Sequence, residues 1–281
     1  LSTMRQSRIL ITGAQGQLGQ ALQGQYADHE VTAWDLQDLD ITQFEEVKKA
    51  LDQLRPHLVI NAAAFTQVDE AEVKQDAAYR GNALGPRNLA VVTKDLGMTL
   101  IHFSTDYVFD GQQNRPYHEF DRTNPLGVYG HSKLAGEEAV RIANPRHFIV
   151  RTAWLYHTVG KNFPNTICRM AGREVVKVVS DQYGSPTFAP HLAQAVFQLG
   201  ETDAFGTYHM AGTGGASWYE LTQALYQALD IQTSVVPIAT AQFPRPARRP
   251  PYAVLTSLQD PLIELPSWEE GVRDFASLWK G

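Results

Sequence analysis

Short apolar runs alternate with longer amphipathic stretches over the first 155 residues. Each apolar run is typical of a buried strand, and these runs occupy residues 8–12, 30–34, 57–60, 98–103 and 147–151. Helical stretches separate them, and these occupy residues 20–23, 41–54, 69–97 and 129–143, with Gly81, Gly85 and Pro86 suggesting a kink in the third. Strands that alternate with helices predict an α/β fold with a Rossmann-type, doubly wound parallel sheet.

The pattern becomes irregular after residue 155, where Pro, Gly and aromatic residues increase. Helices are predicted over residues 162–170, 190–200, 217–229 and 268–280, and strands over residues 174–178 and 206–210. Residues 181–187 predict a turn, and residues 245–251 predict a basic loop. Glu220 follows Ser217 at the spacing of a capping box. We therefore expect a dinucleotide-binding domain over residues 4–155. A smaller substrate-binding α/β subdomain would cover residues 156–281, and parts of it could return to the first sheet.

Composition excludes several classes of protein. The chain has 281 residues, of which 43% are hydrophobic and 19% charged, as in globular proteins. Its net charge of −6 provides no basic field for nucleic acid or an anionic membrane. No apolar run reaches the length of a membrane helix, residues 1–8 lack a signal-peptide core, and Cys168 has no second cysteine to pair with. We expect a cytoplasmic monomer or homodimer.

A glycine-rich turn follows the first predicted strand and precedes the first predicted helix. Gly13, Gly16 and Gly19 would let a pyrophosphate approach the backbone amides at the helix N-terminus, which is typical of dinucleotide binding. A glycine-rich turn without a ligand is the alternative. Asp35 lies just past the second predicted strand, where an acidic residue commonly binds the adenosine ribose. Its carboxylate would repel a 2′-phosphate and favour NADH, unless it is a turn acid like Asp38.

Tyr129 and Lys133 stand four residues apart at the start of a predicted helix, so they share one helix face. A neighbouring ammonium can lower the pKa of a phenol and make it a usable proton donor near neutral pH. Ser104 and Thr105 end the fourth predicted strand, at the edge where parallel sheets bind ligands. Residues 106–128 form a loop long enough to cover a site there.

Together these motifs resemble the extended short-chain dehydrogenase/reductase superfamily. Further segments are similar to the dTDP-4-dehydrorhamnose reductase family, namely residues 61–72, 104–111, 151–156, 181–187 and 249–250. The resemblance runs nearly end to end. It implies reduction of the C4 ketone of dTDP-4-dehydro-L-rhamnose to dTDP-L-rhamnose, with NADPH or NADH as the cofactor and a nucleotide sugar as the substrate.

The resemblance also implies roles for individual residues. Thr105, Tyr129 and Lys133 would be the catalytic triad, in which Tyr129 is the general acid and Lys133, with the oxidised nicotinamide, lowers its pKa. The cofactor would be bound by residues that follow the first three predicted strands and by two residues of the triad: Gly13, Gly16, Gln17, Leu18, Gly19, Asp35, Asp40, Ile41, Ala62, Ala63, Ala64, Tyr129 and Lys133. The substrate would be bound by Thr66, Val68, Thr105, Asp106, Trp154 and Arg249. No carboxylates cluster as metal ligands, so we expect no metal.

One segment departs from the family pattern. Members commonly carry Arg-Pro-x-Asn-Ser-x-Leu, whereas residues 249–255 read Arg-Pro-Pro-Tyr-Ala-Val-Leu and lack the polar Asn-Ser pair. The identity of the sugar or base is therefore open. A dehydratase is disfavoured, because Tyr107 follows Thr105-Asp106 where dehydratases carry Glu. A reductase or epimerase of another nucleotide 4-keto sugar and a non-catalytic NADP-binding regulatory subunit remain alternatives.

Overall fold

The structure is a computed structural model that describes residues 7–280. The outermost residues of the two predicted domains, 4–6 and 281, lie outside the described residues. Six parallel strands form the main sheet in the order β10-β5-β4-β3-β1-β2. Their bounds are β1 Arg8–Thr12, β2 Glu30–Trp34, β3 Leu58–Asn61, β4 Thr99–Thr105, β5 His147–Thr152 and β10 Gly206–His209. The predicted doubly wound parallel sheet is confirmed.

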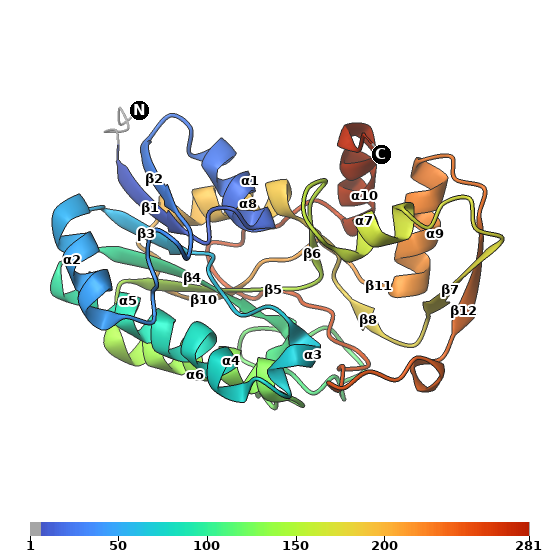
Figure 1. Cartoon of the computed structure of the whole chain (residues 1–281), viewed down its shortest axis with the longest axis horizontal. Coiled ribbons are helices and arrows are strands. Elements are labelled where there is room, and N and C mark those ends of the chain that lie inside the picture. Colours follow the sequence, from blue (N-terminus) through green and yellow to red (C-terminus); the bar gives the residue numbers. More distant parts are fainter. Residues whose placement is uncertain (1–6, 281) are drawn as a thin grey trace.

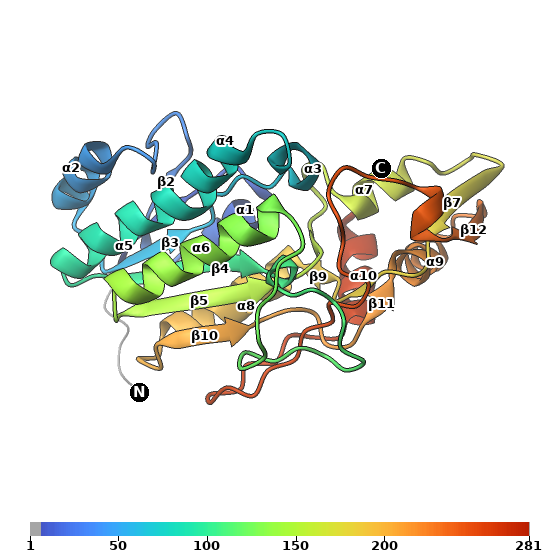
Figure 2. The same ribbon diagram turned by 90° about the horizontal axis from the view of Figure 1, so that it is seen from below.

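Helices cover both faces of this sheet because its strands are apolar on both sides (Figure 1). Ile9 and Ile11 of β1 point toward α1 and α8, and Leu10 points to the opposite face. On that opposite face α5 and α6 run side by side (Figure 2). The covering helices are α1 Gln17–Gln25 and α8 Ala189–Gly200 on one face, and α2 Phe44–Leu54, α5 Gly85–Asp95 and α6 Val128–Ala143 on the other.

The predicted helical stretch over residues 69–97 is interrupted, as its glycines suggested. It consists of α3 Val68–Ala71, α4 Gln75–Tyr79, a π-helical turn over Arg80–Leu84, and α5. A Cβ at Gly85 would lie 2.6 Å from the side chain of Ile41, so the glycine leaves space for that isoleucine in the core. α3 follows the carboxyl end of β3, so it begins on that side of the sheet.

The C-terminal region builds a second core from short elements. Tyr156, Phe188, Leu221 and Phe275 are buried there, among helices α7 Phe163–Cys168, α9 Trp218–Ala228 and α10 Trp268–Leu278. The capping box at Ser217 is confirmed. Three pairs of strands complete the region: β6 Leu155–Tyr156 with β9 Thr187–Phe188, β7 Val175–Val179 with β12 Ser234–Ile238, and β8 Tyr183–Gly184 with β11 Ala216–Ser217. Single 3-10 turns lie at Asp106–Val108 and Thr240–Gln242.

Two elements that follow residue 155 belong to the main sheet or to the helices that cover it. Helix α8 packs on α1, and β10 extends the sheet beyond β5. The expected turn over residues 181–187 contains β8 and begins β9, and strands β6, β11 and β12 were not predicted. Among residues 7–280 no helix is long and apolar enough to cross a membrane.

Candidate active site

The predicted site residues gather at the carboxyl edge of the main sheet. Strand order reverses between β1 and β3, because the chain passes from β2 back across β1 to reach β3. A crevice outside the carboxyl ends of the strands opens at such a reversal and is the usual ligand site of this architecture. The glycine-rich turn follows β1, and Ala62 to Ala64 follow β3, so these two segments flank the reversal.

The glycine-rich turn is built for close backbone contact. Gly13 has a φ of 68°, and a Cβ there would lie 2.6 Å from the amide nitrogen of Ala63. A Cβ at Gly19 would lie 2.3 Å from the carbonyl oxygen of Gly13. The N-cap residue of α1 is Gly16, which has no side chain to occupy the first amides of the helix. The turn therefore presents backbone N–H groups to an anion, which fits a pyrophosphate.

Neighbouring side chains hold this turn in place. The Oδ2 atom of Asp35 accepts a hydrogen bond of 2.9 Å from the Gln15 amide, which ties the turn to the end of β2. The Oε1 atom of Gln17 accepts one of 2.7 Å from the Asn162 side chain and so links the turn to the C-terminal region. Leu18 is buried in the core beneath. Only the backbone of Leu18 is left to contact a cofactor.

The predicted adenine-side residues have other contacts in this structure. Asp40 accepts a hydrogen bond of 2.9 Å from the Thr42 amide; burial opposes the effect, but this bond and the nearby Arg80 charge lower the pKa of Asp40. The side chain of Ile41 is buried in the core below the sheet, so it can offer a ligand only its backbone. Ala62 and Ala63 are half-buried and Ala64 is exposed.

Thr105 and Tyr129 meet at the end of β4. Thr105 is the last residue of that strand, and its hydroxyl accepts a hydrogen bond of 3.2 Å from the Tyr107 amide and donates one of 3.0 Å to Asp106. Tyr129 approaches from the first turn of α6, and its phenol lies close enough to the Thr105 hydroxyl for that hydroxyl to work against the rise of its pKa. The ring of Tyr107 packs edge-on against that of Tyr129, with the centroids 5.4 Å apart. Two hydroxyls thus converge on one position.

The ammonium of Lys133 is held by the main chain of β4. Its Nζ atom donates a hydrogen bond of 2.6 Å to the Phe103 carbonyl oxygen, and burial lowers the pKa of Lys133 to about 8. Burial raises the pKa of Tyr129 to about 12, the Thr105 hydroxyl works against that rise, and the charge of Asp106 adds to it. The expectation that Lys133 and the oxidised nicotinamide together lower this pKa stays a prediction; in the protein alone, the main chain of β4 holds the ammonium.

A buried ion pair between Glu137 and Arg151 lies close to Lys133. Glu137 is fully buried one helical turn further along α6, and its carboxylate accepts bonds from Arg151 Nη2 at 2.7 Å and Nε at 2.9 Å. Ser104 donates to the same carboxylate at 2.5 Å. The charge of Glu137 partly offsets the effect of burial on the pKa of Lys133. The sequence analysis missed Glu137, although its spacing from Tyr129 and Lys133 places all three on one helix face.

The indole of Trp154 is held in place by an unusual backbone conformation and by stacking on a second indole. Its φ of 45° is rare for a residue with a side chain, and its indole stacks on that of Trp218 with centroids 3.3 Å apart and planes 3° from parallel. A Cβ at Gly184 would lie 2.4 Å from the indole, so only glycine leaves room for it. Strain of this kind collects at functional positions. Thr66 is exposed and Val68 is half-buried at the start of α3.

Arg249 is bound to a residue that the sequence analysis did not assign. Its Nη1 atom lies 2.6 Å from Oδ1 of Asp69 in α3, and its Nη2 atom lies 3.0 Å from Oδ2. Arg245 donates to the same carboxylate from Nε at 2.9 Å. The hydrogen bonds from these guanidinium groups hold the pKa of Asp69 well below its usual range. Two cations share one anion, so this cluster keeps a net positive charge.

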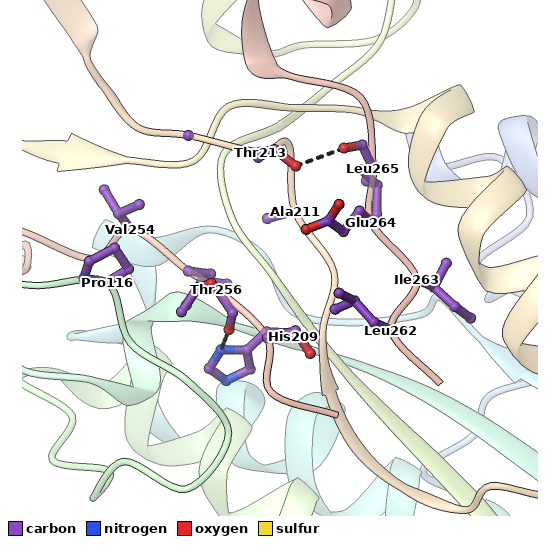
Figure 3. A pocket seen from close by; sticks show the side chains of 13 residues that line it. Pro116, His209, Ala211, Thr213, Val254, Thr256, Leu262, Ile263, Glu264 and Leu265 are labelled. Carbon is purple, nitrogen blue, oxygen red and sulfur yellow. Dashed lines mark hydrogen bonds between the residues drawn. The ribbon is translucent and has the colours of Figure 1, made fainter. Parts of the chain in front are cut away.

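A separate cavity of about 140 Å³ is lined mainly by residues from segments 209–214, 254–257 and 262–265, and none of the predicted site residues line it (Figure 3). Thr213 donates a hydrogen bond of 2.7 Å to the Leu265 carbonyl at its rim, and the His209 ring lies 3.0 Å from the Thr256 carbonyl. The cavity is too small for a nucleotide sugar.

Among residues 7–280 no three His, Cys, Asp or Glu side chains cluster so that they could hold a metal ion.

Comparison with known proteins agrees with this geometry. The family model described as RmlD substrate binding domain matches residues 7–279. A dTDP-4-dehydrorhamnose reductase of Mycobacterium tuberculosis is 42% identical over 267 residues, covering 91% of this chain and 86% of the relative. A dTDP-4-keto-6-deoxy-D-glucose reductase of Streptomyces niveus is 41% identical over 253 residues, with 88% of each chain covered. The crystal structure of dTDP-4-dehydrorhamnose reductase from Bacillus anthracis in complex with NADP superposes with a TM-score of 0.94, at 39% identity, covering 96% of this chain and 99% of that one. This chain therefore belongs to the dTDP-4-dehydrorhamnose reductase family.

Proposed function

We propose that this protein reduces the C4 ketone of dTDP-4-dehydro-L-rhamnose to dTDP-L-rhamnose with NADPH or NADH. The observation that carries the proposal is the pair of hydroxyls of Thr105 and Tyr129, which converge beside the glycine-rich crevice. Such a pair can bind one carbonyl oxygen and deliver one proton to it. Relatives that are named as this reductase match nearly the whole chain.

The residues of the crevice fit a nicotinamide dinucleotide. The open backbone amides around Gly13 and Gly16 suit the pyrophosphate, and the carboxylate of Asp35 suits a ribose hydroxyl. When bound, the cofactor supplies the hydride. We assign its binding to Gly13, Gly16, Gln17, Leu18, Gly19, Asp35, Asp40, Ile41, Ala62, Ala63, Ala64, Tyr129 and Lys133, with Leu18 and Ile41 acting through their backbones.

Three residues would handle the proton and the developing charge. Tyr129 gives its phenolic proton to the ketone oxygen as that oxygen becomes an alcohol. Thr105 donates a hydrogen bond to the same oxygen and so stabilises the negative charge that forms on it. Lys133, fixed by the Phe103 carbonyl, keeps a positive charge on the same helix face as Tyr129 and favours its phenolate.

The remaining assigned residues would position the nucleotide sugar. We propose that the sugar lies among Thr66, Val68, Asp106 and Trp154, and that Arg249 meets the diphosphate. The cluster of Arg249 and Arg245 on Asp69 is net positive, which supports an anion there. A diphosphate would compete with Asp69 for the guanidinium group of Arg249.

A reductase of another dTDP-linked 4-keto sugar is the second candidate. Pro251, Tyr252 and Ala253 replace the polar pair that family members commonly carry, and the Streptomyces niveus relative is named for a different 4-keto sugar. The same catalytic groups would serve both reactions. We also propose that the enzyme works in the cytoplasm as a monomer or homodimer, and that residues 4–155 mainly bind the cofactor while residues 156–281 mainly bind the sugar.

A substrate panel tests the proposal. Oxidation of NADH and of NADPH would be followed at 340 nm with a set of nucleotide 4-keto sugars, and the products would be identified by NMR. We expect the highest kcat/KM with dTDP-4-dehydro-L-rhamnose and one dTDP-L-rhamnose formed per cofactor oxidised. A higher kcat/KM with a different 4-keto sugar would favour the second candidate. Absence of turnover with every sugar would overturn both.

A further inference from the structure

The carboxyl group of Asp106 is buried in the site, and only one of its two oxygens has a hydrogen-bond partner among residues 7–280. It is 2% exposed, and its Oδ1 atom accepts the hydrogen bond of 3.0 Å from the Thr105 hydroxyl. Its Oδ2 atom is buried and has no hydrogen-bond partner among residues 7–280. A buried carboxylate oxygen without a donor is costly while charged, so this position favours the neutral acid.

Asp106 is connected to Tyr129 through one hydroxyl. The Thr105 hydroxyl is hydrogen-bonded to Oδ1 of Asp106, and the phenol of Tyr129 lies close to the same hydroxyl. The Tyr107 amide donates to the same oxygen at 3.2 Å and holds it between the two. The hydroxyl hydrogen can rotate from one neighbour to the other. A proton can pass along the three groups when the phenol and the Thr105 hydroxyl come within hydrogen-bond distance.

The charged groups around this path have partners of their own. Lys133 donates to the Phe103 carbonyl, and Arg249 is held by Asp69. The groups that face Asp106 are the phenols of Tyr107 and Tyr129. Burial raises the pKa of Asp106 to about 7, against hydrogen bonds from Thr105 and from the amides of Asp106 and Tyr107. In the protein alone, Asp106 can therefore exchange a proton near neutral pH.

We propose that Asp106 stores the proton that restores Tyr129 in each turnover and passes it through the hydroxyl of Thr105. The inference rests on the proposed function and deepens it. As the O–H bond of Tyr129 breaks, an O–H bond forms at the ketone oxygen. The phenolate oxygen takes the hydroxyl proton of Thr105, and the Thr105 oxygen takes the carboxyl proton of Asp106. The carboxylate recovers a proton from water after the product leaves, so one solvent proton enters per ketone reduced.

This role differs measurably from simple contact with the sugar. A residue that only binds the sugar affects KM, while a proton store affects kcat and its dependence on pH. The store must be protonated to act, so kcat should fall as pH rises through the pKa of Asp106. In the protein alone the pKa of Tyr129 is about 12, so a fall that is lost in Asp106→Asn belongs to Asp106. Lys133 would cause a second fall, about one pH unit higher, at its own pKa of about 8.

Isosteric substitution at two nearby acids provides the test. Asp106→Asn keeps an oxygen for Thr105 but has no acidic proton. Asp110→Asn is the matched control: hydrogen bonds, first from Asn124, lower the pKa of Asp110, so it is already a carboxylate near neutral pH. Wild type and both variants of the full chain would be compared by steady-state kcat and KM with NADPH and dTDP-4-dehydro-L-rhamnose between about pH 5.5 and about pH 9.

For wild type and Asp110→Asn we expect the rate to fall with an apparent pKa of about 7, set by Asp106. For Asp106→Asn we expect kcat to be about 10- to 100-fold lower at acidic pH, with the fall shifted to the titration of Lys133, in addition to any change in KM from its contact with the sugar. Unchanged rates and an unchanged profile in Asp106→Asn would overturn the proposal. So would a change confined to KM.

A measurement on the wild type covers the case in which Asp106→Asn does not fold. In mixtures of H2O and D2O, several protons moving together give a curved dependence of the rate on deuterium fraction, and a single proton gives a straight line. We expect a curve; a straight line would contradict the relay. Failure of the wild type to reduce any 4-keto sugar would overturn the proposed function itself, which is a distinguishable outcome.

Discussion

Replacement of Lys133 by Met should make the enzyme inactive and yet change its stability in a way that depends on pH. Lys133 is 3% exposed, and burial lowers its pKa from 10.5 to about 8. The difference of about 2.5 units corresponds to about 3 kcal/mol by which burial of the charged ammonium destabilises the folded state below about pH 8. Met fills similar space without a charge, so it removes this cost.

The sign follows from proton binding. Between about pH 8 and about pH 10.5 the unfolded lysine binds more protons than the folded one, so the free energy of unfolding of the wild type rises with pH across that window. From about pH 7 to about pH 9.5 the wild type should gain about 2 kcal/mol relative to Lys133→Met. Loss of the hydrogen bond to the Phe103 carbonyl offsets about 1–3 kcal/mol of the benefit of the substitution, but it does so at every pH.

Urea denaturation at several pH values measures this difference directly. Subtracting the free energy of unfolding of the variant from that of the wild type cancels the contributions of groups that titrate in both proteins, such as the Cys168 thiol. Lys94→Met, at an exposed lysine on α5, is the control, and its difference from the wild type should stay constant. A constant difference for Lys133→Met as well would refute the conclusion that Lys133 is a buried, destabilised cation.

Three further substitutions test other parts of the site. Asp35→Ser should raise the ratio of kcat/KM for NADPH over NADH by about tenfold, because a charge that repels a 2′-phosphate is lost; an unchanged ratio would remove Asp35 from the ribose site. Gly184→Ala should cost about 1–3 kcal/mol of stability and raise KM for the sugar, since its Cβ would lie 2.4 Å from the Trp154 indole. An unchanged KM would mean that Trp154 does not contact the sugar. Glu137→Gln should lower the free energy of unfolding by about 3–5 kcal/mol, because it leaves Arg151 buried without its anion, and a loss below about 1 kcal/mol in urea denaturation would contradict this.

The main sheet was predictable because its strands are short apolar runs. Buried parallel strands need no alternation of polar residues, and the first five strands were all located from this signal. The strands that were missed depend on distant partners. β12 contains Pro237, which argues against a strand by local rules, yet it pairs with β7 more than fifty residues earlier. β8 and β9 each have two residues, too few for a periodic pattern.

The site was predictable where its spacing is local. Tyr129 and Lys133 lie one helical turn apart, and Thr105 ends a strand, so their roles could be proposed from the chain alone. The bond between Lys133 and the Phe103 carbonyl depends on how α6 sits on β4, which no local pattern contains. The pairing of Arg249 with Asp69 joins residues 180 positions apart, so it too required the fold.

The most direct test of the proposed mechanism is the rate of ketone reduction by Tyr129→Phe compared with the wild type. Both proteins would first be shown to bind NADPH by fluorescence, so that loss of folding is not mistaken for loss of chemistry. With dTDP-4-dehydro-L-rhamnose we expect the wild type to form dTDP-L-rhamnose and the variant to be slower by about 10²- to 10⁴-fold in kcat, as is usual when a general acid is removed. A Tyr129→Phe enzyme with full activity would contradict the assignment of Tyr129 as the proton donor.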